Sequence, residues 1–135
     1  MNDQKQAKTL ESIEQFGQAL SRLKEIQGMD LEQKAVLRDA TIQRFEFVFE
    51  LCWKCLKRCL FVEGIESYTP KETLRRAYQS HWLEDEQLWL DMLDDRNLTS
   101  HIYNEETAAE IYGRISRYAP ELERIHLLLK HRFAD

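Results

Sequence analysis

The sequence predicts an all-α protein, an up-and-down antiparallel bundle of five or six helices that forms one domain over residues 1–135. Three observations predict this class. Apolar residues recur at helical spacing through most of the chain, and no segment shows the period-two alternation of a strand. The 4 glycines and 2 prolines stand where helices are expected to begin or end. The chain is long enough to bury one core, and no linker divides it.

The first half of the chain predicts two long helices. The apolar residues of the first share one face, and it is expected to end at Gly28: Leu10, Ile13, Phe16, Leu20, Leu23 and Ile26. Asp30, with Gln33 three residues later as in a capping box, is expected to begin the second helix, which ends near Gly64. Apolar residues cover much of the circumference of this second helix. We therefore expect it to be the most buried, and to leave an apolar face that favours a homodimer.

The second half predicts shorter helices. Thr69 as a cap and Pro70 in the first turn indicate a helix over 71–80. A further helix is expected over 84–97, where the acidic residues at its start complement the helix dipole. Asn104 is expected to begin the last helical stretch, which Pro120 kinks or restarts.

Composition excludes several classes of protein. The net charge of -5 means that the average field does not attract nucleic acid, although a local basic patch stays open as a possibility. No run of about 18 apolar residues is present, so no membrane span is expected. The N-terminal segment does not resemble a secretory signal. The 3 cysteines lie within eight positions and form no disulfide framework, which indicates a reducing compartment and a cytoplasmic location.

Two groups of side chains have the spacing of metal ligands. The first is a stripe on one helix face: Cys52, Cys55 and Cys59. It lacks a fourth ligand, so packing in the core is favoured over a metal site. The second is a set of carboxylates one turn apart: Asp91, Asp94 and Asp95. A solvated helix face is favoured over a divalent ion, with Asp94 or Asp95 orienting the neighbouring Arg96. We expect no metal ion and no other cofactor.

The segment 94–108 carries the residues best suited to chemistry on a phosphodiester. His101 titrates near neutral pH and suits proton transfer, while the guanidinium of Arg96 suits stabilisation of phosphorane charge. In a continuous helix, Arg96 and Tyr103 share a face, but His101 points roughly 140° away from Arg96. The helix is therefore expected to break between Asn97 and Ser100, or a second subunit is expected to complete the site.

This segment also carries a resemblance to a known family. The pattern Arg96-Asn97-x3-His101-x-Tyr103 resembles the signature of HEPN domains, and most closely that of their HepT branch. The blocks RFEFVFELCWKCLK, TPKETLRRAY and WLDMLDDRNLTSHIYNEETA resemble the nucleotidyltransferase substrate-binding protein family. The resemblance spans about residues 10 to 130.

The resemblance implies a homodimeric helical bundle whose motifs lie near the dimer cleft, encoded with a separate minimal nucleotidyltransferase. In some such pairs the HEPN protein is an RNase toxin, and its partner silences it by adding AMP to the motif tyrosine. Carried over, Arg96 and His101 are the catalytic pair, Asn97 takes the polar position, Asp95 supports the motif and Tyr103 is the AMP-modified residue. The chain itself has no Gly-Ser dipeptide and no Asp-x-Asp, so nucleotidyl transfer would belong to another protein.

Two functions follow as hypotheses. The first is a substrate-binding partner subunit of a minimal nucleotidyltransferase, in a toxin–antitoxin-like system, that binds nucleotide or RNA near the dimer cleft. The second is a metal-independent endoribonuclease that uses Arg96 and His101. A phosphate-binding patch is a further candidate, against which a solvated face with a Glu50–Lys54 pair is favoured: Lys54, Lys57, Arg58, Arg75 and Arg76. Trp53 is expected in the core, and Trp82 and Trp89 at an interface.

Overall fold

The computed structural model describes residues 3–30, 32–102 and 104–135. Within these ranges the chain forms helices and no strand, which confirms the predicted all-α class. The elements in chain order are α1 (Asp3–Gln27), α2 (Lys34–Val62), α3 (Pro70–Gln79), α4 (Glu86–Leu98), the short 3-10 helix η1 (Thr99–His101) and α5 (Glu105–Phe133).

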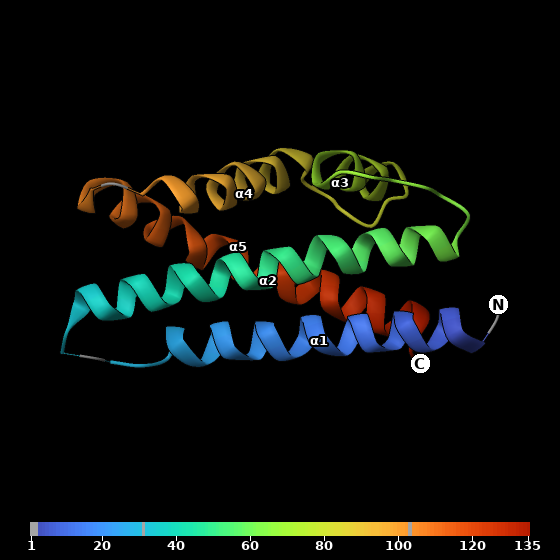
Figure 1. The fold of residues 1–135 in the computed structure, drawn as a ribbon, viewed down its shortest axis with the longest axis horizontal. Helices are drawn as coiled ribbons and strands as arrows, with labels where there is room; N and C mark the ends of the chain where they lie inside the picture. Colours follow the sequence, from blue (N-terminus) through green and yellow to red (C-terminus); the bar gives the residue numbers. More distant parts are fainter. Residues whose placement is uncertain (1–2, 31, 103) are drawn as a thin grey trace.

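The three long helices form the body of the bundle. Helices α1 and α2 run antiparallel along each other, and α5 packs against both of them (Figure 1). The shorter α3 and α4 lie across the other side of α2, and α4 leads through η1 to the start of α5. Helix α4 also contacts α2 and α5, so it lies against both of these long helices. None of the described helices is both long and apolar enough to cross a membrane.

Helix α2 contributes many of the core residues, as its apolar pattern predicts. Phe45, Phe49 and Leu56 have no exposed surface, and Phe45 stacks on Tyr118 of α5 with ring centroids 5.6 Å apart. The stripe of cysteines lies in the same core, fully buried and with free thiols: Cys52, Cys55 and Cys59. Burial raises the pKa of the Cys52 thiol well above its ordinary value. The interpretation of this stripe as core packing is confirmed.

In the part of the chain that the structure describes, side-chain caps begin α3, α4 and α5. The Thr69 hydroxyl accepts a hydrogen bond from the backbone N–H of Glu72 at 3.1 Å, and the Asn104 side chain accepts from Thr107 at 2.8 Å. Both caps were expected from the sequence. The expected cap at Asp30 is wrong: α2 begins at Lys34, with Gln33 in the cap position and no side-chain cap bond. The Asp30 carboxylate instead accepts from the Lys34 ammonium at 2.9 Å.

Two further expectations are corrected by packing. Of the kink or restart expected at Pro120, the restart does not occur: α5 continues as one helix, with Tyr118 and Leu122 on either side buried in the core. Trp82 and Trp89 do not lie at an exposed interface, since their side chains are 4% and 0% exposed. The Trp89 indole N–H donates to the Glu121 carboxylate at 3.2 Å, which satisfies the polar atom of the buried ring.

Candidate functional site

The predicted motif lies where α4 ends, beside α2 and α5. Helix α4 stops at Leu98, and a single 3-10 turn follows before the chain becomes extended at Ile102. The Thr99 hydroxyl donates to the carbonyl of Arg96 at 2.6 Å, in the local side-chain bonding that competes with a continuing helix. The expected break is therefore confirmed. Arg96 occupies the last turn of α4, and His101 lies exposed at the end of η1.

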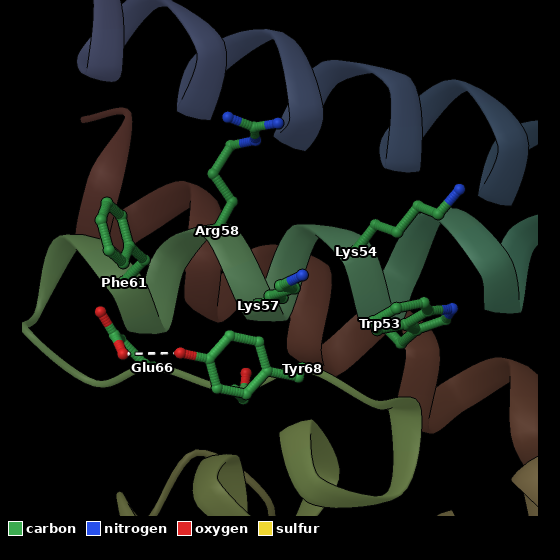
Figure 2. Close-up of a pocket in the computed structure, with 8 residues that line it drawn as sticks. Trp53, Lys54, Lys57, Arg58, Phe61, Glu66 and Tyr68 are labelled. Atoms are coloured by element: carbon green, nitrogen blue, oxygen red, sulfur yellow. Dashed lines mark hydrogen bonds between the residues drawn. The ribbon is translucent and has the colours of Figure 1, made fainter.

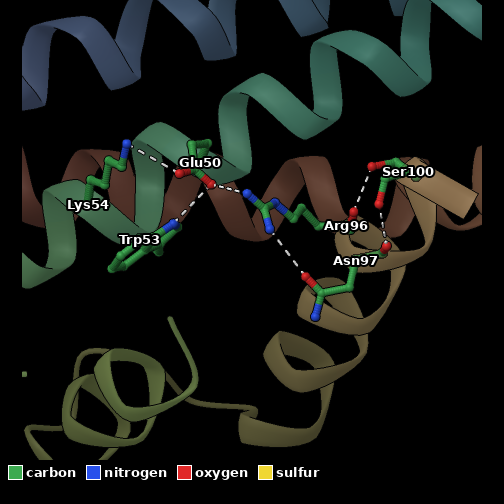
Figure 3. A network of polar contacts seen from close by, with 7 residues as sticks. Glu50, Trp53, Lys54, Arg96, Asn97 and Ser100 are labelled. Carbon is green, nitrogen blue, oxygen red and sulfur yellow. Dashed lines mark hydrogen bonds and ion pairs between the residues drawn. The ribbon is translucent and has the colours of Figure 1, made fainter. Parts of the chain in front are cut away.

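Arg96 is held by a carboxylate from α2. One terminal nitrogen of its guanidinium, Nη2, donates to Oε2 of Glu50, and the other, Nη1, donates to the side-chain oxygen of Asn97 at 3.2 Å (Figure 3). Glu50 also accepts from the Trp53 indole N–H at 3.1 Å and pairs with the Lys54 ammonium at 3.3 Å. The Nε atom of Arg96 is buried and has no hydrogen-bond partner among the described residues. The guanidinium is thus fixed in direction, and its Nε–H is left without an acceptor in the described part of the chain.

The charge of Glu50 is stabilised by its neighbours. Burial acts to raise the pKa of the Glu50 carboxyl, but hydrogen bonds from Trp53 and Lys54 and the charges of Arg96 and Lys54 outweigh it and hold that pKa below its ordinary value. The carboxylate is therefore ionised at neutral pH. The side chains of Glu50 and Arg96 are each 30% exposed. An incoming phosphate would meet a cation that is already paired, and would compete with Glu50 for it.

Asp95 has a different role from the one expected. Its carboxylate is buried, with 4% of the residue exposed, and accepts two hydrogen bonds from the Arg114 guanidinium at 2.7 Å each. The Tyr118 hydroxyl donates to the same carboxylate. Burial, followed by the Asp95 hydrogen bond and charge, raises the pKa of Tyr118, so this hydroxyl stays protonated. Asp95 therefore fastens the end of α4 to α5, while Glu50 orients Arg96.

The remaining predicted residues separate into distinct environments. Asp91 accepts from Gln87 at 2.8 Å and Asp94 is exposed, so these carboxylates do not converge with Asp95. Within the described ranges, no group of three or more histidine, cysteine or acidic side chains is placed to hold a metal ion. Tyr103 lies outside the described residues, and its modification stays a prediction.

Sequence reasoning missed the long-range partners of the motif. It assigned Glu50 only an intrahelical pair with Lys54, which is confirmed, and gave no role to Arg114 or Tyr118. One signal was present for Glu50, because it is a carboxylate inside the apolar run of α2. The partner of such a carboxylate is not encoded locally, since Arg96 lies 46 residues further along the chain.

Comparison with known proteins gives the family. The family profile described as "Nucleotidyltransferase substrate binding protein like" matches residues 11–131, and the chain belongs to this family. A relative from Haemophilus influenzae, named a probable ribonuclease HepT, is 35% identical over 98 residues, which are 66% of this chain and 67% of the relative.

Solved structures share the fold. A crystal structure of a protein from Thermus thermophilus is 41% identical with a TM-score of 0.78, covering 85% of this chain and 98% of that one. The Haemophilus influenzae protein HI0074, described as having the fold of a substrate binding domain of a nucleotidyltransferase, is 26% identical with a TM-score of 0.67, covering 93% and 98%. A tri-AMPylated HEPN toxin of Shewanella oneidensis, solved in complex with its MNT antitoxin, matches in fold at 15% identity with a TM-score of 0.73, covering 97% and 99%.

Proposed function

We propose that this chain is the helical partner subunit of a separately encoded minimal nucleotidyltransferase, and that it binds nucleotide or RNA at the corner formed by α2, α4 and η1. Membership of the nucleotidyltransferase substrate-binding family supports the partnership. The observation that carries the assignment of the site is the Glu50–Arg96 pair. A half-buried guanidinium with an unused Nε donor is preorganised for an anion, and Glu50 occupies its place in the isolated chain.

Co-purification tests the partnership. The tagged chain is expressed together with a minimal nucleotidyltransferase encoded beside it, and the two are expected to elute as one complex on size exclusion. A second, unrelated helical protein with the same tag is the control for nonspecific capture. Elution of the nucleotidyltransferase by itself, at the volume of its free form, would contradict the proposal.

The second candidate function is a metal-independent endoribonuclease. The observation that favours it is the break after Leu98. Because of this break, Arg96 and His101 do not have the relative orientation that a continuous helix would impose, and His101 lies in an exposed turn. RNA cleavage by the purified chain is expected to persist in EDTA and to be lost in His101→Ala. His131→Ala is the matched control, because His131 is also exposed but lies at the far end of α5, paired with Asp135.

Regulation at Tyr103 belongs to the same proposal. Asn104, the residue after Tyr103, caps α5, and the backbone N–H groups of that helix start favour a nearby phosphate. After co-expression with the nucleotidyltransferase, intact-mass analysis is expected to show additions the size of AMP that disappear in Tyr103→Phe. Tyr112→Phe, at an exposed tyrosine of α5, is expected to keep them. An unmodified chain beside an active partner would refute this regulation.

We also propose a homodimer with its interface near residues 96–103. Leu98, at the end of α4, is 42% exposed, so apolar surface is available beside the motif. Sedimentation at micromolar concentration is expected to give the mass of a dimer, and Leu98→Asp is expected to reduce it. A monomer at that concentration would count against the proposal.

A further inference from the structure

A second candidate site lies on α2, nearer the C-terminal end of that helix than Glu50. A pocket of about 470 Å³ opens between α2 and the segment that leads into α3 (Figure 2). Its volume falls within the range of about 300–1,000 Å³ that is typical of small-molecule sites. Two kinds of side chain dominate its lining, aromatic rings and cations: Trp53, Phe61 and Tyr68, with Lys54, Lys57 and Arg58.

Two of the three rings of this pocket are exposed, and each has a polar contact. Tyr68 is 67% exposed and Phe61 is 47% exposed, although large apolar rings are usually covered in a folded monomer. The Tyr68 hydroxyl donates to the Glu66 carboxylate at 2.8 Å, which fixes the ring across the pocket beside Lys57. The Lys5 ammonium lies over the Phe61 ring, 3.9 Å from its centre. Exposed rings of this kind offer faces on which a base can stack.

The cations give the pocket a charge opposite to that of the whole chain. Three cationic residues line it against one carboxylate, Glu66, whereas the chain carries a net charge of -5. Lys57 and Arg58 form no ion pair with any residue that the structure describes, and Lys54 is paired only with Glu50. Arg58 also lines a hollow between α1 and α2, so the cationic surface continues across α2. Unpaired cations beside exposed rings suit a ligand that is both anionic and aromatic.

We propose that this pocket binds a nucleotide unit, with its base stacked on Tyr68 and its phosphate held by Lys57, whose ammonium lies beside the Tyr68 ring. The inference rests on the proposed function for the class of ligand, and extends it by assigning a site separate from Arg96. The two sites are connected, because Trp53 and Lys54 line the pocket and also bond to Glu50, which holds Arg96. The nucleotide comes either from the free pool or from an RNA strand that continues to Arg96.

Calorimetric titration of the full-length chain tests the site. The probes are AMP, ATP, inorganic tripolyphosphate and a single-stranded oligoadenylate RNA. Tyr68→Ala and Lys57→Ala are each expected to weaken binding about tenfold or more, through loss of the stack and of a phosphate contact. Tyr78→Ala and Lys71→Ala are matched controls, exposed residues of α3 outside the pocket, and are expected to stay within about twofold of the parent. Tyr68→Phe keeps the ring and is expected to retain most of the affinity.

Each outcome decides the assignment. Binding of ATP and AMP supports a free nucleotide as the ligand, and binding of the RNA alone supports a strand. Absence of binding by every nucleotide probe overturns the inference, as does equal affinity for tripolyphosphate and ATP, because the base would then contribute nothing. The inference is also overturned if the pocket variants and the α3 control variants show the same change in binding affinity. Co-purification of Tyr68→Ala with the nucleotidyltransferase is measured in parallel, so that failure of this site is distinguished from failure of the partnership.

Discussion

Replacing Asp95 with asparagine perturbs the contact that fixes the end of α4 to α5. The substitution keeps the shape of the side chain but removes its charge and turns one acceptor into an N–H2 group. The buried carboxylate receives two bonds from Arg114 and one from Tyr118, so at least one of these donors loses its acceptor. Breaking a buried ion pair from one side costs about 3–5 kcal/mol. The Arg114 side chain is 35% exposed and regains water, so we expect a loss nearer about 2–4 kcal/mol.

Urea unfolding followed by far-UV circular dichroism measures this loss as a fall in the free energy of unfolding. Asp94→Asn is the matched control: it lies next in sequence on the same helix, but its side chain is exposed, and a change within about 0.5 kcal/mol is expected. A double-mutant cycle of Asp95→Asn with Tyr118→Phe is expected to give a coupling of about 0.5–3 kcal/mol. If Asp95→Asn unfolds at the same urea concentration as Asp94→Asn, the reasoning about this network is refuted.

Gly17→Ala is expected to destabilise the chain by about 1–3 kcal/mol, because the new Cβ would lie 2.6 Å from Nε2 of His126. Gly113→Ala, where nothing lies within 4 Å of the new Cβ, is expected to stabilise the chain by about 0.5–1 kcal/mol. Thermal unfolding measures both variants, and melting temperatures that shift in the same direction would contradict this prediction. Burial lowers the pKa of His126 below its usual 6.5, so the folded chain favours the neutral imidazole ring. The free energy of unfolding is therefore highest above pH 6.5, and it falls as the pH drops below 6.5 and the ring of the unfolded chain takes up a proton more readily than that of the folded chain. Urea midpoints at pH 7.5 and 5.5 are expected to differ less in His126→Gln than in the parent, and an unchanged difference would exclude this cause. Glu50→Gln is expected to change the free energy of unfolding by less than about 1 kcal/mol, since the side chains of Glu50 and Arg96 are each 30% exposed. The same variant is expected to bind RNA more tightly, because the guanidinium of Arg96 no longer pairs with a carboxylate. Weaker RNA binding in a filter assay would argue against competition between Glu50 and phosphate.

The helices were predictable from the sequence because their signals are local. Thr69 and Asn104 are caps followed by acidic residues, and both begin helices in the structure. Asp30 has the same local pattern, yet α2 begins three residues later than a cap at that position requires. Pro120 is a strong local breaker, but packing of its neighbours into the core carries α5 through it. The errors therefore lie where tertiary contacts outweigh local preference.

The candidate site was predictable in its residues but not in its contacts. The break after α4 followed from the weak helix formers between Asn97 and Ser100. Adjacency in sequence suggested that Asp95 orients Arg96, but successive helical residues point in different directions. Asp95 consequently faces α5 and Arg96 faces α2, where Glu50 lies 46 residues earlier in the chain. Such pairings depend on how the helices pack against one another, which cannot be predicted from the local pattern of a single sequence.

This chain is proposed to form a complex with a minimal nucleotidyltransferase. Sedimentation velocity on the two proteins, purified separately and mixed at micromolar concentration, tests it most directly. A single boundary that sediments faster than either protein does in isolation is the predicted result. Two boundaries at the positions of the separate proteins would contradict the claim.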